Sequence, residues 1–176
     1  MASYYFLLSS LPMLRADGGM PFSYSEFLQK CRPCVSDARY ANLQSLTPDS
    51  DKGPLLAEWS KYYAVFKREL NSLRGRRLGR PEERSLSKDE TVLKEISAAL
   101  GDKNPLEAEK ALLSLQFKKL DELIGTHYFD DRALTGYALK LKLLERKSCF
   151  DQKKGKAELD RILDGLQKQI LLEEQG

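Results

Sequence analysis

The sequence predicts an all-α protein, a mostly antiparallel helical bundle with no substantial sheet. Apolar residues recur at steps of three and four along several stretches of the chain, which is the spacing of one helix face. Residues that cap helices stand just before several of these stretches. No stretch shows the alternation of apolar and polar residues that marks a half-buried strand. A charged content of 31% suits helices with charged outer faces.

The composition bounds the size and setting of the protein. We expect one helical domain over residues 1–176, with 75–87 as a candidate flexible linker between an N-terminal half (1–74) and a C-terminal half (88–176). A net charge of +3 is too small to indicate a nucleic-acid or membrane partner. Three cysteines, an odd number, argue against a disulfide framework and for a reducing compartment. The apolar N-terminus lacks the basic region of a signal peptide, and no apolar run reaches the ~18 residues of a bilayer span.

Two short helices are expected near the N-terminus. The apolar run from Tyr4 to Leu11 favours a short buried helix. Ser23 and Glu26 have the spacing of a capping box, so a helix should begin there and run to about Cys31.

The next part of the chain predicts a short helix, a loop and a long helix. Asp37 can cap the short helix, which carries Tyr40, Leu43 and Leu46. The segment TPDSDKGP at 47–54 is a loop because of its proline, glycine and aspartate content. The long helix spans 55–74, and its apolar stripe comprises Leu55, Trp59, Tyr62, Phe66, Leu70 and Leu73.

The second half predicts four more helices. Ser87 and Glu90 form a capping-box pair that opens a helix, and Gly101 is expected just past its last residue. Asn104 caps a helix that stops at Gly125, with Leu106, Leu113, Phe117, Leu120 and Ile124 on its inner face. A helix begins near Asp130 or Asp131 with Leu134, Tyr137, Leu141 and Leu144 inward. The last helix, about 154–173, places Leu159, Ile162, Leu166 and Ile170 on one face.

Two local patterns could carry chemistry, but each has a structural explanation that we favour. Cys31-Arg32-Pro33-Cys34 resembles a redox dithiol, which needs its first thiolate at a helix N-terminus, whereas this pair ends a helix. A zinc site needs four ligands, and no second pair of this kind exists. His127, the only histidine, lies near Asp130 and Asp131 in a turn between helices, where a capping role is commoner than catalysis. We therefore expect no enzymatic activity, no catalytic residues, no cofactor and no metal.

Basic residues provide the candidate partner-binding sites. The arginine-rich loop 74–84 carries Arg74, Arg76, Arg77 and Arg80, and acidic residues in the same loop dilute it. A second set lines the outer side of the helix after Asp131 and comprises Lys140, Lys142, Arg146 and Lys147. Charge of this kind steers association more than it stabilises a fold. A solvated face or linker is the purely structural interpretation of both sets, and a basic surface for docking on a protein is the leading functional interpretation. A nucleic-acid-binding helical module using loop 74–84 is the alternative.

Five segments resemble one specific family: YYFLLSSLPML, PFSYSEFLQ, NPLEAEKALL, THYFDD and ALKLKLLERK. They occur in order over most of the chain. The sequence is similar to an uncharacterised bacterial family whose members are encoded among the subunits of V/A-type ATPases. That family has no established catalytic residues to carry over.

A second resemblance concerns the C component of these ATPases, which is called d in eukaryotic V-ATPases. That component is all-helical and couples the central shaft to the membrane ring. The arrangement of Glu109, Leu112 and Phe117, followed by Tyr137, Leu144 and Arg146, is similar to its helices. This chain is about half the length of a usual C component, which puts a complete cap on the ring in doubt.

These resemblances imply a non-catalytic function. We expect an assembly or coupling subunit of a bacterial V/A-type ATPase, a helical stalk adaptor similar to the C component. Its partners would be other ATPase subunits of the central stalk or membrane ring, with no nucleic acid and no transmembrane segment. It would be cytoplasmic, and peripheral on the inner face of the cell membrane through the ATPase complex.

Overall fold

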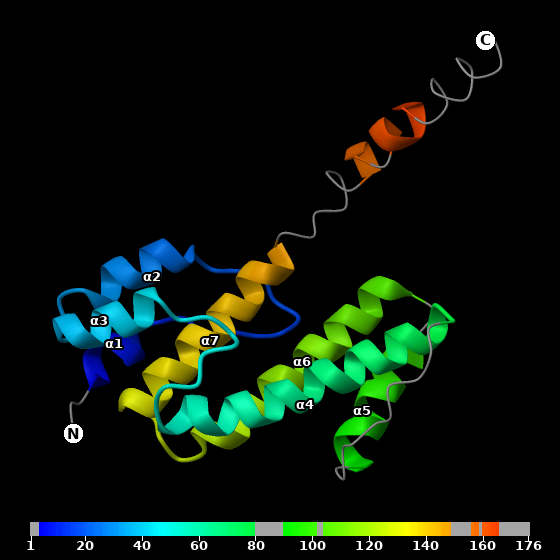
Figure 1. Ribbon diagram of the computed structural model, residues 1–176. Helices are drawn as coiled ribbons and strands as arrows, with labels where there is room; N and C mark the ends of the chain where they lie inside the picture. The colour runs from blue at the N-terminus through cyan, green and yellow to red at the C-terminus, as the bar shows by residue number, and fades with distance from the viewer. Residues whose placement is uncertain (1–3, 80–89, 102–103, 149–155, 159, 166–176) are drawn as a thin grey trace.

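The computed structural model describes residues 4–79, 90–101, 104–148, 156–158 and 160–165 (Figure 1). These residues contain helices and no strand, so the predicted all-α class is confirmed. The helices are α1 (Tyr5–Ser10), α2 (Tyr24–Cys31), α3 (Asp37–Gln44), α4 (Pro54–Arg77), α5 (Glu90–Gly101), α6 (Pro105–Ile124) and α7 (Asp131–Ser148). Residues 156–158 and 160–165 are helical as well. Within the described part of the chain, no helix combines the length and apolar content needed to cross a bilayer.

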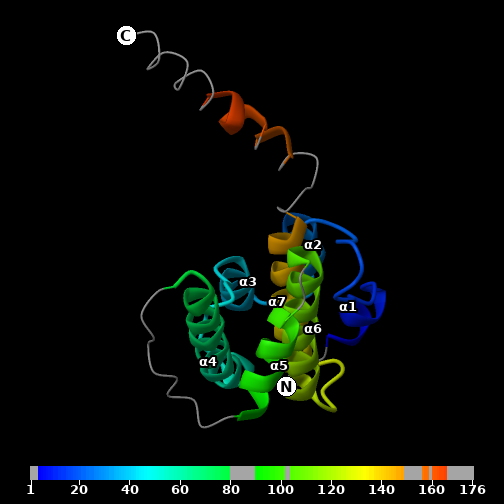
Figure 2. The same cartoon turned by 90° about the vertical axis from the view of Figure 1, so that its right-hand side faces the viewer.

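The three long helices form the body of the molecule. α6 and α7 make an antiparallel hairpin, since only residues 125–130 connect them. α4 packs on both, and α5 packs on α4 and α6. α2 and α3 pack on each other, and α2 also packs on α7. Figure 2 shows α4 and α1 on opposite sides of the α6–α7 hairpin.

The hydrophobic core is shared by the two halves of the chain. Trp59 and Phe66 of α4 and Phe27 of α2 are almost fully buried. They belong to the same apolar cluster as Leu120 of α6 and Leu134 of α7. Burying each such side chain contributes very roughly 1.5–3 kcal/mol before entropy is counted. The Trp59 indole N–H donates to the Pro48 carbonyl at 2.9 Å, which ties the loop before α4 to the core.

Several helices begin or end at the capping residues that the sequence predicted. Ser23 and Glu26 form both hydrogen bonds of a capping box at the start of α2. The Asn104 side chain accepts from the Leu106 N–H at the start of α6. Gly125 ends α6 with a φ of 58°, a conformation that suits glycine. Local hydrogen-bonding chemistry thus determines these ends.

Other details of the predicted elements were wrong. α3 is capped by Ser36 rather than Asp37, because the Ser36 hydroxyl accepts from the Arg39 N–H. Leu106 is 53% exposed, since it lies in the first turn of α6, and Leu112 is buried instead. α5 still includes Gly101. The predicted capping residue Ser87 lies outside the described residues.

The last predicted helix is helical where the structure describes it, but its apolar face is not buried there. Ile162 is 50% exposed and Leu163 is 48% exposed. Leu159, Leu166 and Ile170 lie outside the described residues. The described part of this helix therefore adds nothing to the core of the bundle.

Candidate functional site

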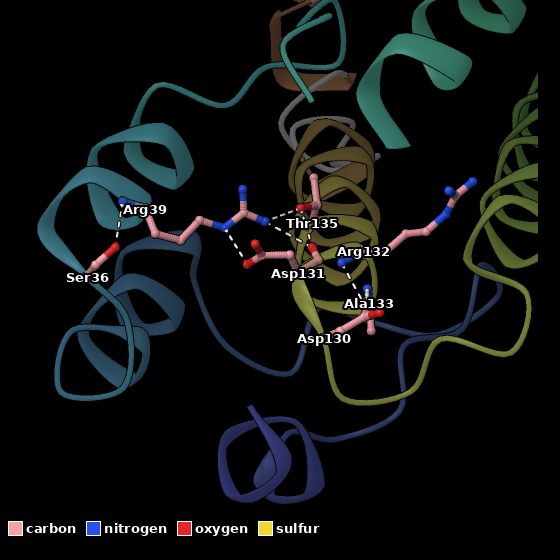
Figure 3. A network of polar contacts seen from close by, with 7 residues as sticks. All are labelled: Ser36, Arg39, Asp130, Asp131, Arg132, Ala133 and Thr135. Atoms are coloured by element: carbon pink, nitrogen blue, oxygen red, sulfur yellow. Dashed lines mark hydrogen bonds and ion pairs between the residues drawn. The ribbon is translucent and has the colours of Figure 1, made fainter. Parts of the chain in front are cut away.

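The loop between α6 and α7 is held in place by the start of α7. The Asp130 carboxylate accepts from the backbone N–H groups of Arg132 at 3.0 Å and Ala133 at 3.1 Å, so it caps α7 (Figure 3). The His127 ring nitrogen Nδ1 pairs with the other oxygen of Asp130. Burial opposes ionisation of Asp130, but the hydrogen bonds from Ala133 and His127 outweigh it, so the pKa of this carboxyl is lowered. The side chain that caps α7 is therefore Asp130, and His127 contacts this capping carboxylate.

Arg39 ties α3 to the first turn of α7. Its Nη2 donates to the Asp131 carbonyl at 2.9 Å and also to the Thr135 hydroxyl. Its Nε lies 3.1 Å from the Asp131 carboxylate, and the arginine side chain is only 19% exposed. Figure 3 shows this guanidinium reaching from α3 across to α7. The link joins residues more than ninety positions apart, and no local pattern in the sequence indicates it.

Arg132 joins the other side of the same loop. Its Nε donates to the Leu123 carbonyl at 2.6 Å near the end of α6. Its Nη2 donates to the Glu58 carboxylate of α4 at 2.8 Å. Together, Arg39 and Arg132 fasten the start of α7 to α3, α4 and α6.

A cleft of about 250 Å³ opens beside this network. It lies at the first turns of α4 and α7, and its lining comprises Arg39, Lys52, Gly53, Pro54, Leu55, Leu56, His127, Asp130, Asp131, Arg132 and Thr135. The charged groups of Arg39, Arg132, Asp130 and Asp131 pair within the protein. The lining contains no serine or cysteine that His127 could activate. Over the described residues, no group of three or more His, Cys, Asp or Glu side chains could hold a metal ion.

A group of exposed aromatic rings lies on α1 and on the same loop. We call Tyr5, Phe6, Tyr128 and Phe129 the aromatic surface. Their exposed fractions are 51%, 86%, 67% and 40%. The rings touch in sequence, with centroids 5.5 Å apart for Tyr5–Phe6, 4.6 Å for Tyr5–Phe129 and 6.4 Å for Tyr128–Phe129.

Tyr4 anchors the aromatic surface to the bundle. Its backbone N–H donates to the Phe129 carbonyl at 2.8 Å, and its side chain is 7% exposed. Burial and a hydrogen bond with Asp131 raise the pKa of the Tyr4 hydroxyl. The prediction of a buried helix at Tyr4–Leu11 was therefore only half correct. Tyr4 and Leu7 point into the core, and Tyr5 and Phe6 point out.

The comparisons with known proteins identify a family. The family model described as "Protein of unknown function (DUF2764)" matches residues 80–170. The chain belongs to the DUF2764 family. No curated protein and no solved structure matches it. The DUF2764 match covers α5, α6 and α7, and so includes Tyr128 and Phe129 of the aromatic surface but not Tyr5 and Phe6.

In this DUF2764 protein, three of the four basic residues predicted on α7 are not on an outer side. Lys140 pairs with Asp121, and its side chain is 12% exposed. Lys142 is 25% exposed and pairs with Glu145, with its Nζ 3.8 Å from the centre of the Tyr24 ring. The reason is that α7 is the central helix of the bundle, packed on α2, α4 and α6.

The other two residues of the predicted α7 set, Arg146 and Lys147, differ in their surroundings. Lys147 donates to the Ala16 carbonyl at 2.9 Å and to the Gly18 carbonyl at 3.1 Å, so it holds the segment after α1. Arg146 is exposed. Of the predicted α7 set, Arg146 is thus the residue whose charge faces solvent.

The arginine-rich segment 74–84 was predicted to be a loop throughout, and this prediction was wrong for its first residues. α4 continues through Arg77, so Arg74 and Arg76 are helical. Arg74 pairs with Glu109 of α6, which the sequence pattern did not indicate. Arg77 is the last residue of α4, and Arg80 lies outside the described residues.

Cys31 of the cysteine pair differs from a reactive thiol in its position and in its environment. Cys31 is the last residue of α2 and is fully buried, whereas Cys34 is exposed. Burial, and to a lesser extent Cys34, raise the pKa of the Cys31 thiol to about 12. A reactive thiol requires a shift in the opposite direction.

Proposed function

We propose that this DUF2764 protein is a non-catalytic helical adaptor that binds other subunits of a bacterial V/A-type ATPase. It would stand in the position of the C component of the stalk, on the cytoplasmic side of the membrane. The adaptor would join its partners as a rigid body, because a packed helical core resists deformation.

The convergence of two sequence segments carries this proposal. The segments YYFLLSSLPML and THYFDD are two of those that support the resemblance to the ATPase-associated family. They lie more than a hundred residues apart in the chain, yet together they build the aromatic surface. An exposed aromatic cluster costs solubility unless something covers it, so it supports a role in binding another protein.

Purification of the native complex tests the proposal. The full chain would be tagged at its C-terminal end, which keeps the tag off α1, and expressed at native level from its own chromosomal position. Membranes would then be extracted gently, and the co-purifying proteins identified by mass spectrometry. We expect ATPase subunits in fixed ratio to the tagged chain, and none with an unrelated tagged helical protein. Recovery of no ATPase subunit while the extracted ATPase remains active would contradict the proposal.

A further inference from the structure

The aromatic surface is large enough to be a binding site in its own right. Four rings of 150–250 Å² each, exposed by 40–86%, present roughly 500 Å² of aromatic area. Monomeric soluble proteins rarely expose contiguous apolar patches larger than a few hundred Å², and those that do generally use them to bind something.

The aromatic surface is also pre-organised. The hydrogen bond from Tyr4 N–H to the Phe129 carbonyl joins its two segments. The Asp130 cap fixes the loop that carries Tyr128 and Phe129. A partner would therefore lose little free energy in ordering these rings, which favours binding.

The charges beside the rings select the kind of partner. Residues 4–10 and 125–131 contain two aspartates and one histidine, and the arginines beside them, Arg39 and Arg132, are paired with Asp131 and Glu58. The Asp131 side chain remains 64% exposed although it pairs with Arg39. An anionic bilayer attracts unpaired basic side chains, whereas Arg39 and Arg132 are already paired within the protein. A second copy of this chain would bury only roughly 500 Å² per chain here, less than the ~800 Å² that each partner buries in a standard interface.

We propose that the aromatic surface binds an amphipathic α-helix of another protein, with the helix's apolar face on the four rings and a basic side chain near Asp131. The area supports a helix rather than a broad interface. Roughly 500 Å² is less than the ~800 Å² that each partner buries in a standard interface. It fits a single helix laid down with apolar anchors one or two turns apart. This inference rests on the proposed adaptor function only in expecting the helix to belong to an ATPase subunit.

Site-specific photo-cross-linking tests the inference in cells. A benzophenone amino acid would replace Phe6 in one full-length variant and Tyr128 in another. A third variant would carry it at Leu78, which is 70% exposed and directly follows the last residue of α4. The C-terminal end of α4 lies away from α1 (Figure 1). Positions 6 and 128 should both cross-link to one peptide that has helical apolar spacing and carries lysine or arginine. Position 78 should not. Cross-links to a second copy of the chain, to lipid, or to nothing would each overturn the inference.

Substitutions test the contacts themselves. Phe6→Ser combined with Tyr128→Ser changes only side chains that are 86% and 67% exposed, so the fold should be unaffected. Recovery of the partner should fall at least tenfold, an effect of about the size expected for aromatic hot spots. The matched control Leu78→Ser should leave recovery unchanged. Asp131→Asn should lower recovery severalfold, and less so at high salt because salt screens the lost attraction. Unchanged recovery with the aromatic double variant would overturn the inference.

The outcomes separate this inference from the proposed function. If the cross-linked basic helix belongs to a protein outside the ATPase, the inference stands and the ATPase proposal fails. If ATPase subunits and every other co-purifying protein are recovered equally well with the wild type and the aromatic double variant, the ATPase proposal stands and the inference fails.

Discussion

At the residue scale, Arg39 is the side chain of the cleft that links α3 to α7. It contacts the carbonyl and carboxylate of Asp131 and the hydroxyl of Thr135. Thr135 in turn donates to the Asp131 carbonyl at 2.6 Å. Because the arginine side chain is 19% exposed, these contacts are partly shielded from water, and removing the guanidinium leaves polar groups with fewer partners.

Replacement of Arg39 should therefore destabilise the protein more than replacement of a surface arginine. We expect Arg39→Leu to lower the free energy of unfolding by about 1–3 kcal/mol. The control Arg32→Leu breaks an ion pair with Asp37 whose side chains are 55% and 90% exposed, and should cost about 0–1 kcal/mol. Urea unfolding measures both, with the fluorescence of Trp59, the only tryptophan, as the probe. Equal losses would show that Arg39 contributes no more than a surface pair.

At the element scale, the sequence predicted helices well where their signals are local. Ser23 and Asn104 cap α2 and α6 as predicted, because a cap depends on residues two or three positions away. Such local signals could not predict which residues of α7 face solvent and which face the core. Its lysines looked like a solvated face, but three neighbouring helices surround α7, and Lys140 and Lys142 find partners within the protein. The spacing of apolar residues along a helix does not reveal how many other helices pack around it.

The close approach of α6 and α7 gives a prediction at the same scale. A Cβ atom on Gly136 would collide with the Ile124 side chain, whereas one on Gly101 would meet nothing within 4 Å. We expect Gly136→Ala to lower the free energy of unfolding by about 1–3 kcal/mol. Gly101→Ala should be neutral or stabilising by up to about 1 kcal/mol, since alanine favours a helix.

A double-mutant cycle checks the stated cause of the Gly136 effect. If the Ile124 side chain is the obstacle, Gly136→Ala introduced into an Ile124→Ala background should be neutral or stabilising. A loss that is the same in both backgrounds would place the collision elsewhere. Thermal and urea unfolding of the four variants provide the comparison.

At the scale of the whole molecule, the fold class was predictable from the sequence, but the aromatic surface was not. The run from Tyr4 to Leu8 is uniformly apolar, so its pattern cannot tell which residues point outward. One clue was available, because consecutive aromatic residues such as Tyr5-Phe6 and Tyr128-Phe129 cannot all face one core. What the sequence could not indicate is that the two pairs meet, since their contact depends on how α1 is placed beside the α6–α7 loop.

The arrangement of the whole molecule also separates two basic residues that the sequence had grouped together on α7. Lys142→Glu removes the ion pair with Glu145 and the contact with the Tyr24 ring, and puts two acids three positions apart. We expect it to lower the free energy of unfolding by about 1–3 kcal/mol. Arg146 is exposed, so the effect of Arg146→Glu on folding should be small. The variant loses a favourable positive charge near the C-terminal end of α7, and stability should change by less than about 1 kcal/mol.

Arg146→Glu can therefore test the predicted basic contact without confusing binding with folding. If Arg146 contacts an acidic partner surface, the variant should remain as stable as the wild type in urea while less partner is recovered in the native purification. Arg146→Gln, which removes the charge without reversing it, should give an intermediate loss. Because a surface charge acts mainly by steering association, the difference between wild type and variant should shrink as salt is raised. Full recovery of the partner with Arg146→Glu at low salt would remove this residue from the interface and leave the aromatic surface as the remaining candidate on this part of the molecule.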